Sequence, residues 1–127
     1  YEVAIAARRG DAADRLAEVL RVDSLAWEDT GESESDLYVN ATSLGTQEND
    51  PPAVPAEALE HRPLVFDCVY RKDGSPTATV RAARAARCPV VEGIRMFASQ
   101  AVRQARLFGV VDAREEEVSR ILSGVRP

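Results

Sequence analysis

The chain has 127 residues, of which 45% are hydrophobic, with a formal net charge of −5 and a pI near 4.9. This length suffices for one hydrophobic core, and the acidic balance argues against a protein that binds nucleic acid through its phosphates. No apolar run approaches the roughly 20 residues that cross a bilayer, so we expect a cytoplasmic protein with neither a nucleic-acid nor a membrane partner.

Short apolar runs alternate with helical patterns along the chain. Continuous apolar runs such as residues 2–7 are typical of parallel strands covered on both faces, and Asp11 is placed to cap the helix that follows. The alternation predicts an α/β fold with a mainly parallel sheet and right-handed crossovers. Strands are expected at 2–7, 22–27, 37–41, 64–70 and 89–93, and helices at 11–20, 55–59, 76–87, 94–108 and 113–123.

Polar residues follow the predicted strands where each strand ends, which is where ligands bind in open α/β sheets. Arg8 and Arg9 follow the first strand. Dinucleotide folds read the adenosine ribose at this position, and arginine there accommodates the additional phosphate of NADP. Solvated charges at a turn are the alternative. Likewise, Thr42 and Gly45 after the third strand either face a site or simply turn the chain.

Three motifs occur in a fixed order along the chain. Asn40–Gly45 reads Asn-Ala-Thr-Ser-Leu-Gly, Asp67–Tyr70 reads Asp-x-x-Tyr, and Gly93–Gln100 reads Gly-x-x-Met-x-x-x-Gln. Together they resemble the carboxyl-terminal domain of the shikimate dehydrogenase family. The resemblance implies a Rossmann-like, mostly parallel sheet with helices on both faces, in one partial dinucleotide-binding domain over residues 1–127 that lacks its first strand, turn and helix.

The resemblance also implies an NADP-dependent oxidoreductase that interconverts 3-dehydroshikimate and shikimate. Arg8 matches the arginine that holds the 2′-phosphate, and Arg9 assists it. The substrate is then a hydroxylated cyclohexene carboxylate, contacted by Tyr70 and Gln100. The remaining cofactor-binding residues implied are Asn40 and Thr42 in the loop, Gly93 through its backbone, and Met96 beside the nicotinamide ring.

Several features depart from the family pattern. Ala7, Thr46 and Arg95 replace an asparagine, a methionine and a glycine. Arg95 either narrows the pocket, contacts an anionic group of the substrate or points to solvent. These departures keep two alternatives open, namely a quinate/shikimate dehydrogenase paralogue with an altered substrate and a non-catalytic nucleotide-binding domain.

No residue of this chain is a good acid/base candidate, and His61 is expected to lie in a loop. The family's catalytic Lys and Asp belong to an amino-terminal substrate domain, which we expect as a partner within the same protein, so the fragment alone should be inactive. No glycine-rich phosphate-binding turn occurs in the chain. Cys68 and Cys88 are expected to be reduced thiols without a metal. A homodimer is left open.

Overall fold

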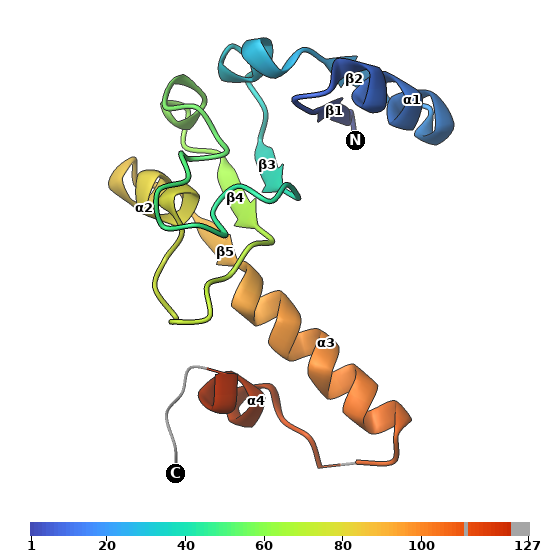
Figure 1. Ribbon diagram of the computed structural model, residues 1–127, viewed down its shortest axis with the longest axis vertical. Coiled ribbons are helices and arrows are strands. Elements are labelled where there is room, and N and C mark those ends of the chain that lie inside the picture. The colour runs from blue at the N-terminus through green and yellow to red at the C-terminus, as the bar shows by residue number, and fades with distance from the viewer. Residues whose placement is uncertain (111, 123–127) are drawn as a thin grey trace.

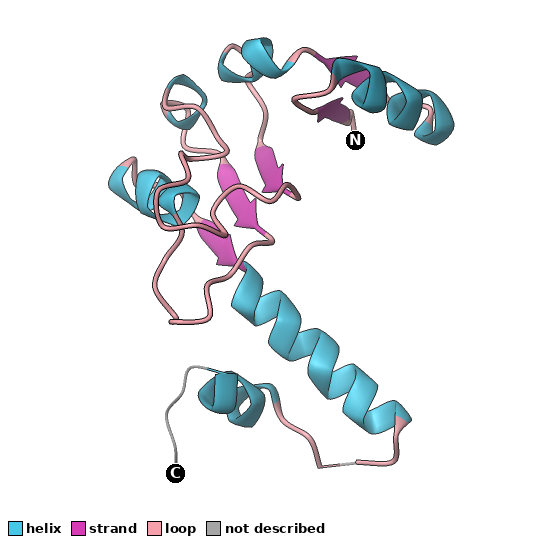
Figure 2. Cartoon of the chain, in the orientation of Figure 1, coloured by secondary structure: helices cyan, strands magenta, loops and turns pink. Residues whose placement is uncertain are grey.

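The computed structural model describes residues 1–110 and 112–122, among which strands and helices alternate (Figure 1, Figure 2). Position 111 and the end of the expected domain, 123–127, with the last residue of the expected helix 113–123, lie outside the described residues. The strands are β1 (Ala4–Ala6), β2 (Asp23–Leu25), β3 (Leu37–Asn40), β4 (Leu64–Asp67) and β5 (Val90–Glu92). The helices are α1 (Gly10–Leu20), α2 (Ala78–Ala85), α3 (Gly93–Leu107) and α4 (Glu115–Leu122), with short 3-10 turns η1 (Trp27–Gly31) and η2 (Glu57–Leu59).

The strands form two parallel sheets rather than one. β1 pairs with β2 in the first, and β3, β4 and β5 pair in that order in the second. The α/β class and the parallel pairing predicted from the sequence are therefore confirmed. Within the described residues no strand joins β1 to β3, so each of these two strands has one edge without a backbone partner.

The core lies on one face of the second sheet. Val65 of β4 is fully buried against Ala83 of α2 and against Ala58 and Leu59 of η2. The opposite face is open, since Leu37 and Val39 of β3 are about half exposed. Helices on both faces were expected, but no described helix covers this side of β3.

The start of α1 differs from the prediction that Asp11 caps it. Arg9 occupies the capping position without a side-chain hydrogen bond. Asp11 lies inside the first turn, where its carboxylate pairs with Arg15 one turn later, at 2.8 Å. In the first turn, the negative charge of Asp11 interacts favourably with the helix dipole. Among the described residues, its side chain does not accept a hydrogen bond from a free N–H group of the helix. The buried face of α1 is narrow, because Ala13 and Ala17 are buried whereas Leu16 is 48% exposed.

The carboxyl-terminal part is helical. α3 begins directly where β5 ends and extends away from the sheet (Figure 1). α4 packs against it, and Ser99 of α3 donates a 2.8 Å hydrogen bond to Glu115 of α4. Among the helices described, none has the length and apolar character needed to span a membrane.

Candidate functional site at the strand ends

The carboxyl ends of the three strands of the second sheet are aligned in one row. Asn40 of β3 is paired with Asp67 of β4, and Asp67 is paired with Glu92 of β5. Because the strands are parallel, the residues that follow them leave the sheet at the same edge. Thr42, Tyr70 and Gly93 therefore emerge on one rim, as the sequence predicted.

A buried polar network joins this rim to α2. The carboxylate of Asp67 is fully buried and accepts hydrogen bonds from the Asn40 amide at 2.8 Å, from the backbone N–H of Val69 at 3.1 Å and from the hydroxyl of Thr77. Thr77 in turn caps α2 by accepting the N–H of Val80 at 3.1 Å. The network holds two strand ends and one helix start in a fixed arrangement.

Asn40 also shapes the loop that follows β3. Its side-chain oxygen accepts hydrogen bonds from the backbone N–H and the hydroxyl of Thr42, at 3.1 and 2.7 Å, and its amide donates to the carbonyl of Leu44 at 3.0 Å. The loop ends at Gly45, whose φ of +103° is a conformation that glycine adopts readily. Asn40 is 3% exposed, so it supports the loop from beneath while Thr42 remains on the surface.

A crevice of about 490 Å³ lies between the ends of β1 and β3. This volume is within the usual range for small-molecule sites. Arg8 and Arg9 line it, and neither has a carboxylate partner within the described part of the chain. Thr42 lies on the opposite wall. The remaining lining residues are Ala7, Ala12, Trp27 and Leu44.

Tyr70 and the first turns of α3 form the other end of the rim. The rings of Tyr70 and Phe97 lie 5.2 Å apart between centroids, and Tyr70 is 40% exposed beside a hollow of about 70 Å³ that Ile94 also lines. Phe97 and Gln100 follow Gly93 by four and seven residues, so all three lie on one face of α3. Gln100 is exposed about two turns out from the sheet, which is roughly 10 Å along the helix.

Gly93 is required by packing. A Cβ atom at this position would lie 2.6 Å from the carbonyl carbon of Cys68 and 2.8 Å from the carbonyl oxygen of Asp67. Such distances are far inside van der Waals contact. The glycine therefore lets α3 begin directly against the end of β4.

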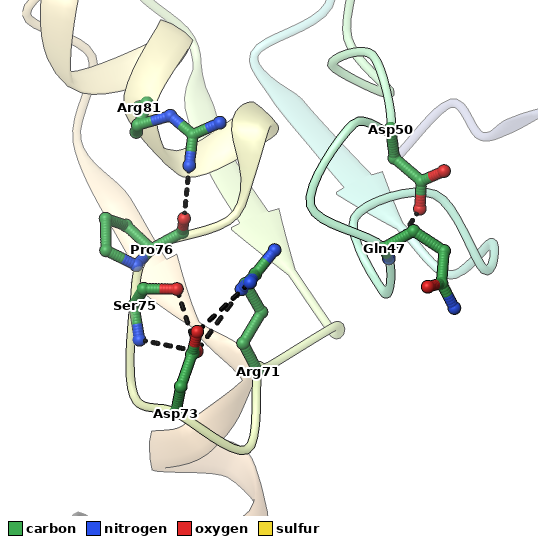
Figure 3. Close-up of polar contacts among 7 residues, drawn as sticks. All are labelled: Gln47, Asp50, Arg71, Asp73, Ser75, Pro76 and Arg81. Atoms are coloured by element: carbon green, nitrogen blue, oxygen red, sulfur yellow. Dashed lines mark hydrogen bonds and ion pairs between the residues drawn. The ribbon is translucent and has the colours of Figure 1, made fainter.

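Two surface loops beside the rim are held by aspartates. Asp73 accepts a two-pronged ion pair from Arg71 and two hydrogen bonds from Ser75 (Figure 3). These contacts, led by Arg71, hold the pKa of Asp73 well below its usual range. In the same way, the backbone N–H groups of Gln47 and Gly45, each 2.9 Å from the Asp50 carboxylate, lower the pKa of Asp50.

The structure brings some predicted site residues together and separates others. Arg8, Arg9 and Thr42 share the crevice, whereas Tyr70 belongs to the smaller hollow and Gln100 stands out on α3. Met96 is half-buried in the first turn of that helix. Arg95 is exposed, and His61 lies in a loop as expected, 59% exposed at its side chain and 3.8 Å from Glu34.

Thr77 and Trp27 at this edge were not among the residues expected at the site, and Asp67 was expected only as part of the Asp-x-x-Tyr motif. Asp67 interrupts an apolar run and Thr77 directly precedes the helix, and both signals were present in the sequence. Trp27 was assigned to a strand over 22–27, but β2 ends at Leu25 and Trp27 begins η1. Trp27 therefore lies two residues beyond the end of β2, where it lines the crevice.

The polar and charged side chains described at the rim are suited to binding and orienting a ligand. The described residues contain no cluster of three or more His, Cys, Asp or Glu side chains suited to a metal ion. Cys68 and Cys88 are both free thiols, and burial raises the pKa of each. They are therefore poor nucleophiles near neutral pH.

The chain is similar in sequence to known proteins. No protein-family model matches it. The shikimate dehydrogenase (NADP(+)) of Maridesulfovibrio salexigens is 32% identical over 125 residues, which is 95% of this chain and 44% of that protein. The chain thus spans under half the length of this relative.

Solved structures of shikimate and quinate dehydrogenases are also similar to this chain. Shikimate 5-dehydrogenase from Thermus thermophilus, solved with NADP(H) and shikimate, matches with a TM-score of 0.80 and 28% identity over 98% of this chain and 46% of that one. Quinate dehydrogenase from Corynebacterium glutamicum, solved with NAD, matches with a TM-score of 0.79 and 26% identity over 94% of this chain and 45% of that one. By sequence and by fold, the chain belongs to the shikimate dehydrogenase family.

Proposed function

We propose that this chain is the NADP-binding part of a shikimate dehydrogenase-like oxidoreductase, which interconverts 3-dehydroshikimate and shikimate. The observation that carries the proposal is the crevice of about 490 Å³ in which Arg8 and Arg9, both without a carboxylate partner among the described residues, face Thr42. Free guanidinium groups at the end of a parallel strand fit a phosphate group. In a chain of net charge −5, they make a locally positive site.

Each residue has a separate part in this proposal. Arg8 binds the 2′-phosphate of the adenosine ribose, and Arg9 adds a second charge or a planar stacking surface. Thr42 contacts the cofactor, while Asn40 holds the Thr42 loop through its two hydrogen bonds to that residue. When bound, the cofactor supplies the hydride, and the protein supplies orientation and selectivity.

The α3 end of the rim is assigned to the nicotinamide and the substrate. Gly93 offers backbone groups at the start of the helix, and Met96 provides an adaptable apolar wall. Tyr70 and Gln100 are neutral hydrogen-bonding groups suited to a polyhydroxylated ring. The proton must then be handled by an acid/base pair outside this chain, in a substrate domain of the same protein.

We assign the open strand edges to one further parallel strand. β1 and β3 each have one unpaired edge, and Val3 and Val39 beside those edges are about half exposed. A strand between them would join the two sheets and bring with it the turn and helix expected from the family. In the longer protein, the edge amides of β3 should exchange hydrogen far more slowly than in this chain alone.

The cofactor assignment is tested by replacing Arg8 and Arg9 with alanine in the full-length protein. We expect the Kd for NADP⁺ to rise by about 100-fold, from two lost charge-assisted hydrogen bonds, and far more than the Kd for NAD⁺. Arg103→Ala, an exposed arginine on α3, is the matched control. An equal loss for both cofactors would remove the arginines from the phosphate site.

One observation favours a second candidate, a quinate/shikimate dehydrogenase with an altered substrate. Arg95, a departure from the family pattern, is exposed on the first turn of α3 close to the assigned nicotinamide end. A panel of shikimate and quinate with both cofactors, run on wild type and on Arg95→Gly, separates the two. An unaltered profile would indicate that Arg95 faces solvent.

A further inference from the structure

Trp27 occupies a position equivalent to that of Arg8. Ala6 of β1 is paired with Leu25 of β2, and Arg8 and Trp27 each follow two residues later. Because the two strands are parallel, both side chains are carried past the same sheet edge, and both line the crevice. The indole therefore belongs to the wall next to the two arginines.

The indole lies outside the hydrophobic core. Trp27 is half-buried but lies outside the core cluster, which is centred on Val65. Within residues 1–110 and 112–122, its N–H group has no hydrogen-bond partner, and the close ring contact is between Tyr70 and Phe97 instead. A large aromatic ring beside an open crevice is then available to a ligand.

We propose that Trp27 is the platform on which the adenine ring of the cofactor stacks, an inference that rests on the proposed function. The 2′-phosphate and the base are bonded to the same ribose, so a phosphate held by Arg8 keeps the base within a few bond lengths of the neighbouring wall. Ala7 and Ala12, which also line the crevice, have small side chains that leave room for a planar ring. Purines stack favourably on indole and guanidinium planes alike.

The test uses the full-length protein and two variants of similar bulk. Trp27→Phe keeps an aromatic face, whereas Trp27→Leu keeps apolar contact without one. The Kd for adenosine 2′,5′-bisphosphate should rise about 5- to 100-fold in Trp27→Leu, the range that loss of one stacked base predicts, and less than about threefold in Trp27→Phe. Nicotinamide mononucleotide, which lacks adenine, should bind all three proteins equally.

Fluorescence gives a second readout. The signal of Trp27, taken as wild type minus Trp27→Phe, should be quenched by adenosine 2′,5′-bisphosphate and not by inorganic phosphate. If wild type binds the bisphosphate, and the arginine variants weaken it, while Trp27→Leu and the fluorescence do not change, the stacking role is wrong and the cofactor site stands. If wild type does not bind the bisphosphate at all, the proposed function itself is overturned.

Discussion

The side-chain amide of Asn40 donates a 2.8 Å hydrogen bond to the buried carboxylate of Asp67, which ties together the ends of two neighbouring parallel strands. The same carboxylate accepts the hydroxyl of Thr77 at the start of α2. The loop that carries Thr42 and the helix start behind it are thus positioned by one buried group.

Replacing Asp67 with alanine should be strongly destabilising. The change leaves the Asn40 amide and the Thr77 hydroxyl without their acceptor, and an unsatisfied buried polar group costs about 1–3 kcal/mol. We expect the free energy of unfolding, measured by urea denaturation, to fall by about 3 kcal/mol or more. Asp14→Ala, at an exposed site on α1, should change it by less than about 0.5 kcal/mol. Similar losses for both variants would contradict the network's role.

Gly93 allows a second test of the rim. Gly93→Ala forces a methyl group against the backbone of Asp67 and Cys68, so α3 must shift, and overpacking of this kind costs about 1–3 kcal/mol. The matched control is Gly10→Ala at the start of α1, where a Cβ meets no atom within 4 Å. The thermal midpoint of Gly10→Ala should be unchanged or slightly higher than that of the wild type. If Gly93→Ala were as stable as the control, α3 could shift away from the end of β4 without a cost in stability, and the prediction would be wrong.

The order of strands and helices was predictable because each apolar run and each helical period is a local property of the sequence. The exact first and last residues of these strands and helices were less predictable. The strand expected at 64–70 ends at Asp67, since the Asp67 side chain accepts the N–H of Val69 and turns the backbone. Likewise the helix expected from Pro76 begins at Ala78, because Thr77 is its cap.

The division into two sheets could not be read from the sequence. An apolar run such as residues 2–7 indicates a strand, but it does not say which neighbour will pair with it or what will cover it. Trp27 illustrates the same limit. Its place in the crevice follows from the register between β1 and β2, which is a non-local relationship.

The ion pair between Arg71 and Asp73 predicts a pH dependence. The pKa of Asp73 is lowered in the folded protein, so the folded state binds its proton less readily than the unfolded state, whose carboxyl titrates near 3.9. The stabilisation is therefore complete above about pH 5, begins to decline as the pH falls through about 4, and is lost only at a still lower pH, where the carboxyl of the folded protein is protonated. Asp73→Asn, compared with wild type, should lower the thermal midpoint at pH 7, and the difference should be smaller at pH 3.

An exposed aspartate on β2 serves as the control for that experiment. Asp23 has no side-chain partner in the described part of the chain, and Asp23→Asn should leave the midpoint unchanged at both pH values. The Arg71 pair is more than half exposed on the Asp73 side, so the shift in midpoint should also shrink in high salt. A difference as large at pH 3 as at pH 7, or one that does not shrink in high salt, would contradict the charge-based explanation.

Gln100 provides a test of the substrate end of the rim. It shares a face of α3 with Gly93 and Phe97 and is exposed about two turns beyond the sheet edge. Gln100→Ala in the full-length protein should raise the KM for the hydroxylated ring about 10-fold, as expected for a lost neutral hydrogen bond, with the Kd for NADP⁺ unaltered. Gln104→Ala, one turn further out, should behave as wild type. If both variants leave KM unchanged, Gln100 makes no contact with the substrate.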